Sequence, residues 1–205
     1  MGMTMATRVS ESQPVSFEEA SRDARLSRIV DWIDRFLCVP NPALGRTGNV
    51  CPYAKTAILK RSLEFYRNFS RSVAGLASDM EQHLEEFLQS KRSDDIYYCR
   101  LVIPDELGDA SSAIECVQKQ LKPMFVERHL MIGQFFPDCA EPGLHNRAFR
   151  PLQTPVPLLA IRHMVLSDIA FLYGNERYMT AYLENFEERG SVAIRQFEAS
   201  MEAPK

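Results

Sequence analysis

Several common catalytic signatures are missing from this 205-residue chain. It has no GxSxG segment, the nucleophile elbow of many serine hydrolases, and no GxGxxG fingerprint for dinucleotides. It also lacks HExxH and paired-histidine spacings, so a closed zinc site is not expected. These absences remove several frequent enzyme classes but do not exclude catalysis.

The sequence also lacks a CxxC pair and any long apolar run. Its cysteines are odd in number and fit no zinc-finger spacing: Cys38, Cys51, Cys99, Cys116 and Cys139. No apolar run approaches the roughly 20 residues that cross a bilayer, and the N-terminal residues do not resemble a secretory signal. We therefore expect free thiols in a reduced, cytoplasmic protein that does not enter a membrane.

Charge and composition are those of an ordinary globular protein. Apolar residues make up 45% of the chain and charged residues 25%, and the length suits one domain with a substantial core. The net charge of −3 argues against a nucleic-acid partner or an acidic membrane surface. We predict one domain over residues 1–205, with residues 1–15 as a flexible tail and a small molecule as partner. A homodimer is compatible with this composition.

Apolar periodicity predicts an α+β fold, with a helical N-terminal half followed by a small sheet packed with helices. Helices are predicted over residues 17–37, 52–66, 72–91, 109–121 and 176–189. Residues 191–200 either extend the last helix or form an edge element. Strands are predicted over residues 96–103, 130–136 and 158–165, which are rich in aromatic and branched apolar side chains. Ser16 and Glu19 have the spacing of a capping box for the first helix.

The most informative segment covers residues 133–164. It contains four prolines after Pro137, two histidines and three arginines, with little helical or strand period before Val156. A long irregular segment in a compact domain is usually a functional loop or disorder. Apolar side chains favour an anchored loop here. The expected anchors are Leu144, Phe149, Leu152 and Val156.

His145 and three arginines are the candidate binding residues of this segment. No helical period would bury His145, and a neutral imidazole is a common ligand of transition metals and haem iron. A surface or loop-stapling role is the alternative. Arg147, Arg150 and Arg162 suit bidentate recognition of carboxylates. The remaining histidines, His83, His129 and His163, are predicted to be structural or solvated.

A second candidate is the loop of residues 41–53, NPALGRTGNVCPY. A helix is predicted to begin near Pro52, so Arg46 and backbone N–H groups could bind an anion there. Cys51 would then have a lowered pKa and could act as a nucleophile. The loop is no P-loop, because it lacks the GK[ST] ending. A tight turn with a half-buried cysteine is the alternative, with about equal weight.

The blocks LGRTGNVCPY, LMIGQFFP and GLHNRAFRPLQTPVPLLAIRHMVLSDIAFL resemble an uncharacterised bacterial family of small proteins over nearly the whole chain. More distantly, the layout is similar to the YqcI/YcgG-type proteins, which include haem-dependent N-oxygenases. Cys51, Pro52 and Tyr53 match an early proline–cysteine–aromatic motif with cysteine and proline reversed. Residues 142–150 match a later segment with histidine and arginines. This resemblance implies haem as cofactor, His145 as iron ligand, and Cys51 and Tyr53 as catalytic residues.

Three functional hypotheses follow. The first is a haem-dependent oxygenase that oxidises a small nitrogen-containing metabolite of specialised metabolism. In it, the cofactor or a substrate carboxylate is held by Arg46, Arg147, Arg150 and Arg162. The second is a metal-free enzyme with Cys51 as nucleophile and a loop histidine as base. The third is a non-catalytic protein of a biosynthetic pathway that binds a small anion.

Overall fold

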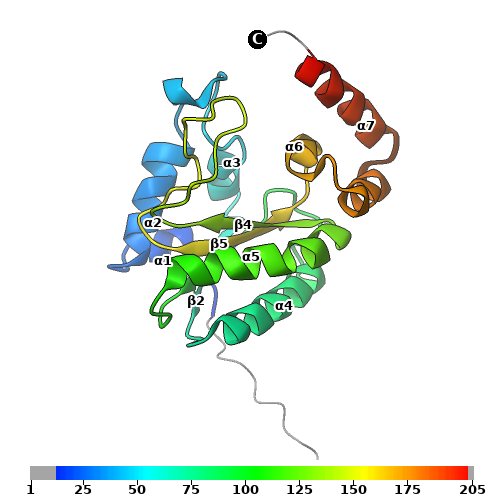
Figure 1. Cartoon of the computed structure of the whole chain (residues 1–205). Coiled ribbons are helices and arrows are strands. Elements are labelled where there is room, and N and C mark those ends of the chain that lie inside the picture. Colours follow the sequence, from blue (N-terminus) through cyan, green and yellow to red (C-terminus); the bar gives the residue numbers. More distant parts are fainter. Residues whose placement is uncertain (1–12, 203–205) are drawn as a thin grey trace, which may run out of the picture.

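The computed structural model describes residues 13–202 and shows an α+β fold built on a five-stranded mixed sheet, which confirms the predicted class. The strand order is β1-β2-β3-β5-β4. The strands are β1 (Val15–Ser16), β2 (Leu63–Asn68), β3 (Cys99–Pro104), β4 (Leu130–Phe135) and β5 (Leu158–His163). β2 and β3 are parallel, whereas β5 is antiparallel to β3 and β4. The sheet lies in the middle of the fold and does not follow a separate helical half (Figure 1).

Helices cover both faces of the sheet. On one face lie α4 (Val73–Gln89) and α5 (Ala110–Glu127) (Figure 1). The other face is covered in part by α1 (Phe17–Ala20), α2 (Leu26–Trp32), the π-helix η1 (Ile33–Leu37) and α3 (Ala54–Leu59). The remaining helical elements are η2 (Pro42–Leu44), η3 (Leu166–Asp168), α6 (Ile169–Leu172) and α7 (Glu176–Glu202).

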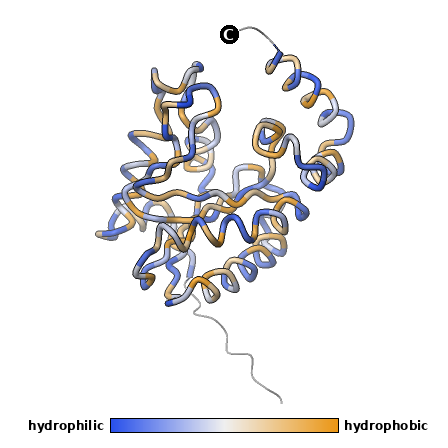
Figure 2. Tube along the Cα trace, viewed as in Figure 1, coloured by the Kyte–Doolittle hydropathy of each residue, from blue (hydrophilic) through white to orange (hydrophobic). Residues whose placement is uncertain are grey.

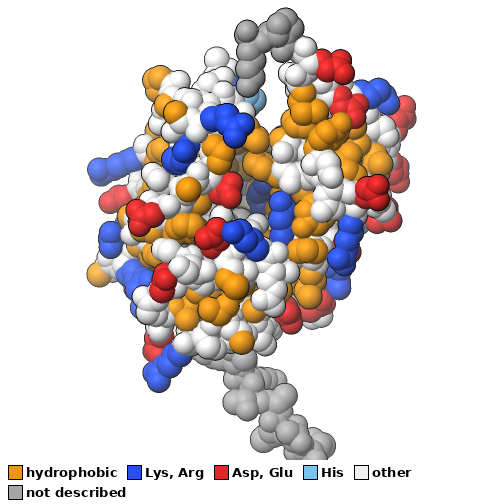
Figure 3. All heavy atoms as spheres, in the orientation of Figure 1, with side chains coloured by type: hydrophobic (Ala, Val, Ile, Leu, Met, Phe, Trp, Pro, Cys, Tyr) orange, Lys and Arg blue, Asp and Glu red, His pale blue; other side chains and the backbone are white. Residues whose placement is uncertain are grey.

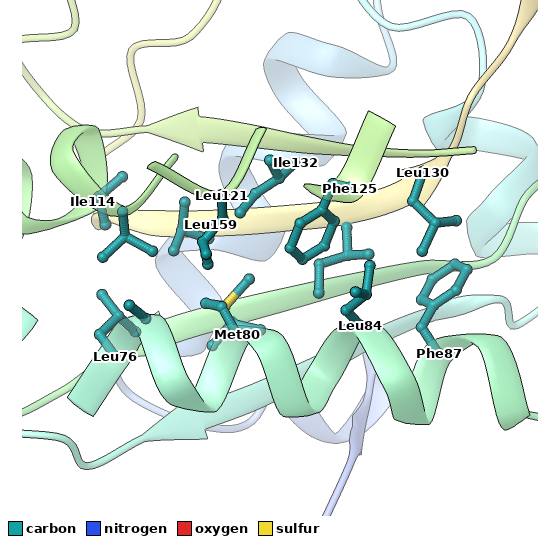
Figure 4. Packing of buried hydrophobic residues seen from close by; sticks show 14 of the residues in the cluster. Leu76, Met80, Leu84, Phe87, Ile114, Leu121, Phe125, Leu130, Ile132 and Leu159 are labelled. Atoms are coloured by element: carbon teal, nitrogen blue, oxygen red, sulfur yellow. The ribbon is translucent and has the colours of Figure 1, made fainter. Parts of the chain in front are cut away.

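The largest core cluster lies between the sheet and the α4–α5 layer. Side chains of α4 at helical spacing point toward α5 and the sheet (Figure 4): Leu76, Met80, Leu84 and Phe87. Ser72 caps α4 by accepting a hydrogen bond from the Gly75 N–H, so the predicted helix over residues 72–91 is confirmed. β4 and β5 are largely hydrophobic, whereas hydrophobic and hydrophilic residues alternate along α4 and α5 (Figure 2).

The predicted helix over residues 52–66 is wrong in its second half. α3 ends at Leu59 in a Schellman motif, in which the Ser62 N–H donates to the Ala57 carbonyl and the Arg61 N–H to the Ile58 carbonyl. Arg61 has φ +54, a left-handed conformation that glycine usually supplies. The stop signal was therefore absent from the sequence, and the alternating residues 63–68 form β2.

Three other helices differ from the prediction. The helix expected over residues 109–121 continues through Pro123 to Glu127 as α5. The one expected over residues 17–37 is divided, because the Asp23 carboxylate accepts from the Arg25 and Leu26 N–H groups and starts a new helix at α2. The last helix continues to Glu202 across a break at Glu187, where φ is +50. Residues 1–12 of the predicted tail lie outside the described residues, whereas Val15 pairs with Phe65. Within residues 13–202, no helix is long and apolar enough to span a bilayer.

An Arg61→Gly variant is expected to be more stable than the wild type by about 0.4–1 kcal/mol, because glycine adopts a positive φ without steric cost. Urea denaturation should show a higher midpoint with an unchanged slope. Lys60→Gly is the matched control, since Lys60 has φ −83 and should gain nothing. Equal effects of the two substitutions would contradict the assigned motif.

Candidate functional site

A groove crosses the sheet face opposite α4 and α5. On one side of it, Leu101 and Leu158 pack in a cluster with α2 and α3. On the other side, Met131 packs with Ile169 of α6. The space-filling view is hollowed between these two parts of the molecule, with a basic side chain at depth (Figure 3). Two separate layers thus leave part of the sheet open.

The floor of this groove follows from strand register. Cys99, Arg162 and Met131 are cross-strand neighbours, as are Ala160 and Gly133, so all five side-chain positions share one face. Gly133 is half-buried, and the Arg162 side chain keeps 33% of its surface exposed although it lies on a strand inside the sheet. We call these five residues the sheet groove.

Arg162 is held in the groove by Asp168. Its Nη1 and Nη2 atoms donate to the two carboxylate oxygens at 2.7 and 2.6 Å, and Nη1 also donates to the His163 carbonyl at 2.8 Å. Asp168 is almost fully buried and accepts the Val165 N–H as well. The Nε–H and the second Nη2–H have no hydrogen-bond partner within residues 13–202. These two N–H groups are parallel donors on one edge of the guanidinium and match the two oxygens of a planar anion. We call this pair of donors the free fork.

The environment of Arg162 keeps it charged. Burial lowers the pKa of its guanidinium, but the hydrogen bond and charge of Asp168 more than offset this, and the thiols of Cys99 and Cys51 raise it further. Burial in turn raises the pKa of the Cys99 thiol to about 12. The groove therefore holds a fixed cation with two thiols near it.

The structure also brings the two predicted loops together. Gly45 lies against His145 so closely that a Cβ at this position would be 2.9 Å from the His145 Cβ, and its φ of +77 also favours glycine. The Asn146 side chain donates to the Ala43 carbonyl at 2.8 Å. Phe149 is buried against the early loop, whereas Leu144 is exposed and anchors nothing.

Next to these loops lies a pocket of about 520 Å³ between α2, η1 and residues 143–153, which we call the loop pocket. Trp32, Phe36 and Phe149 line it, and Arg150 is the one predicted arginine among its lining residues. The Arg46 guanidinium donates to the Thr47 and Val50 carbonyls of its own loop. Arg147 is exposed. The four predicted arginines thus do not surround one cavity.

A haem bound through His145 does not fit this arrangement. His145 is exposed, is not a lining residue of the loop pocket, and has the Gly45 backbone against its Cβ. Arg46 and Arg150 already donate to backbone carbonyls, and Arg162 is paired with Asp168. The described residues also contain no group of three or more His, Cys, Asp or Glu side chains that could hold a metal ion.

Neither of the two predicted catalytic residues has a histidine as hydrogen-bond partner within residues 13–202. Cys51 is half-buried, and its N–H donates to the Leu37 carbonyl. Tyr53 precedes the short helix α3 and packs near Tyr97, with ring centroids 6.3 Å apart. No hydrogen bond within residues 13–202 joins Cys51 to a histidine.

A buried polar cluster that was not predicted lies under α4. The hydroxyls of Tyr66 and Tyr98 donate to one oxygen of Glu64 at 2.8 and 2.9 Å, and Arg100 Nε donates to the Tyr98 hydroxyl at 2.8 Å. His83 packs on the Tyr66 ring and is 13% exposed, so it is structural and not solvated. In a strand, successive side chains point to opposite faces of the sheet. If residues 63–68 had been recognised as a strand, this rule would have indicated the cluster. Its groups satisfy one another, so it stabilises the fold and offers no binding site.

Fold and groove together define a small α+β protein with an arginine on the floor of an open sheet groove. The chain belongs to the family described as Domain of unknown function (DUF6875), whose model matches residues 26–197. The predicted membership of an uncharacterised family is thereby confirmed, and the matched range includes both loops and the sheet groove. The chain matches no curated protein and no solved structure.

Proposed function

We propose that the protein binds a small carboxylate-bearing metabolite in the sheet groove, with Arg162 as its anchor. The observation that carries this proposal is the free fork of Nε and Nη2 on an arginine whose other donors are taken by Asp168 and a backbone carbonyl. An arginine fork binds a carboxylate through two parallel hydrogen bonds. Because Asp168 already fixes the guanidinium, little side-chain entropy is lost when the ligand binds.

The rest of the groove suits a small organic acid. Gly133 and Ala160 have little or no side chain and lie on the same face of the sheet as Arg162. A Cβ at Gly133 would lie 3.1 Å from the Phe135 ring, so glycine leaves room for this ring at the edge of the groove. The Asp168 charge offsets that of Arg162, which favours a singly charged ligand over a polyanion.

The experiment that tests this proposal compares acids with their uncharged amides. Purified protein is titrated with a panel of small carboxylic acids and the matching primary amides, and binding is followed by calorimetry. We expect at least one acid to bind and its amide to bind at least tenfold more weakly, since the amide cannot accept two hydrogen bonds from the fork. Equal binding of acid and amide would contradict an arginine anchor.

A second candidate is a metal-free enzyme with Cys51 as nucleophile. It is favoured by the closeness of the Cys51 thiol to the Arg162 guanidinium, whose pKa that thiol influences. A bound acid with an electrophilic carbon would then lie near the sulfur. Covalent labelling of Cys51 by such an acid, measured against labelling of the exposed Cys116, distinguishes catalysis from simple binding.

The haem-dependent oxygenase implied by the distant YqcI/YcgG resemblance has no support from the geometry of His145. Its direct test is a visible spectrum of protein produced with added haem. A Soret band lost in His145→Ala would favour it over the carboxylate proposal.

A further inference from the structure

Cys38 and Cys51 lie on two chain segments that pair with each other. Residues Pro40 and Asn49 form an antiparallel bridge, and the Val50 N–H donates to the Val39 carbonyl at 3.1 Å. Cys38 and Cys51 lie just beyond these two pairs, one on each segment. The Cys51 N–H donates to the Leu37 carbonyl at 2.9 Å, so the register shifts by one residue and Leu37 lies opposite Cys51, with Cys38 next to it.

This pairing places the two cysteines at a separation suited to a disulfide. The Cys51 N–H is bonded to the carbonyl of the peptide unit that also contains the Cys38 nitrogen, so standard backbone dimensions limit the Cα atoms of Cys38 and Cys51 to about 7 Å. Disulfides need Cα atoms about 4.4–6.8 Å apart. Both cysteines are free and half-buried. We propose that Cys38 and Cys51 form a reversible disulfide in exchange with a low-molecular-weight disulfide such as glutathione disulfide.

The exchange occurs in two steps. The Cys51 thiolate attacks one sulfur of glutathione disulfide, which forms a mixed disulfide and releases one glutathione thiolate. The Cys38 thiolate then attacks the Cys51 sulfur, which forms the Cys38–Cys51 bond and releases the second glutathione. The protein loses two electrons and two protons, and glutathione disulfide is reduced to two glutathione molecules. Excess glutathione reverses both steps.

Cys51 is the better first nucleophile of the pair. Burial raises the pKa of the Cys38 thiol, and the charges of Asp34 and Cys51 raise it further. The charge of Cys51 raises the pKa of the Arg162 guanidinium, so this cation lies close to the sulfur that attacks first. Cys38 therefore acts in the second step, where its closeness to Cys51 compensates for its low thiolate fraction.

The other thiols do not compete well for this bond. Burial raises the pKa of Cys99 to about 12. Cys116 is exposed on α5, and Cys139 is buried in the core between α5 and the sheet, away from the Pro40–Asn49 bridge. The inference rests on the paired backbone and stands apart from the proposed carboxylate ligand.

Peptide mapping tests the inference directly, because trypsin cuts after Arg35, Arg46 and Lys55 and puts the five cysteines on five different peptides. Native protein is incubated with excess glutathione disulfide, free thiols are alkylated, and the digest is analysed without reduction. We expect the peptide of residues 36–46 joined to that of residues 47–55, with loss of alkylation at Cys38 and Cys51. Dithiothreitol should restore both.

Variants supply the controls. Cys116→Ser should keep the cross-linked peptide, and Cys38→Ser should leave Cys51 as a stable mixed disulfide with glutathione. Three results would overturn the inference in the native wild type. They are no link between the two peptides, mixed disulfides alone, or a link from Cys51 to the Cys99 peptide of residues 93–100.

Discussion

Asp168→Asn is expected to lower the free energy of unfolding by about 2–3 kcal/mol. The substitution removes the carboxylate that pairs with both terminal nitrogens of Arg162 and leaves that guanidinium without a counter-charge. Removing one partner of a buried ion pair typically costs about 3–5 kcal/mol. Arg162 keeps a third of its surface exposed, so solvent screens part of this loss. Urea denaturation at neutral pH measures the difference.

The control for this experiment is the exposed ion pair of α5. Lys119 and Glu115 are one helical turn apart at 2.7 Å, and both are largely exposed. Glu115→Gln should therefore change stability little, since surface ion pairs contribute weakly. If Asp168→Asn were as mild as Glu115→Gln, Asp168 would not hold Arg162 in place.

His83 is expected to make the protein lose about 2 kcal/mol of stability between pH 7 and pH 5. Its pKa falls from 6.5 to about 4 on folding, first because of burial and second because of the Arg100 charge. Glu86 and Asp79 of α4 raise it only in part. Between pH 6.5 and 4 the unfolded chain binds a proton that the folded chain does not, so stability falls as pH falls through this range.

His83→Gln should remove most of this pH dependence, as measured by urea denaturation at pH 7 and pH 5. Burial also lowers the pKa of His163, so a smaller dependence of stability on pH should remain. His145→Gln is the matched control. Because His145 is exposed, its replacement should leave the dependence of stability on pH unchanged. If His83→Gln left the dependence of stability on pH unaltered, the buried, neutral state of this ring would be contradicted.

The parts of the fold that were predicted correctly are those where one physical signal dominates. The apolar stripe and Ser72 cap define α4, and runs of branched and aromatic residues mark β3, β4 and β5. β2 was missed because the preceding helix ends at an arginine with positive φ. Here the tertiary structure imposes a conformation that the local sequence does not favour.

Prediction of the site was less complete. The early loop and the His145 segment were expected to meet, and Gly45 lies against His145. Arg162 was singled out, but its ion pair depends on a turn that brings Asp168 back to the sheet, and the turn has no sequence signature. The open groove could not be predicted at all, because it exists only where two separately packed layers fail to meet.

The dissociation constant of the best-binding acid in Arg162→Lys tests the central claim most directly. Lysine keeps the charge and can still pair with Asp168, but it lacks the Nε–Nη2 fork. We expect at least tenfold weaker binding in this variant, and unchanged binding in Arg150→Lys, which alters the loop pocket alone. Unchanged affinity in Arg162→Lys, or a loss confined to Arg150→Lys, would contradict the assignment of the sheet groove as the binding site.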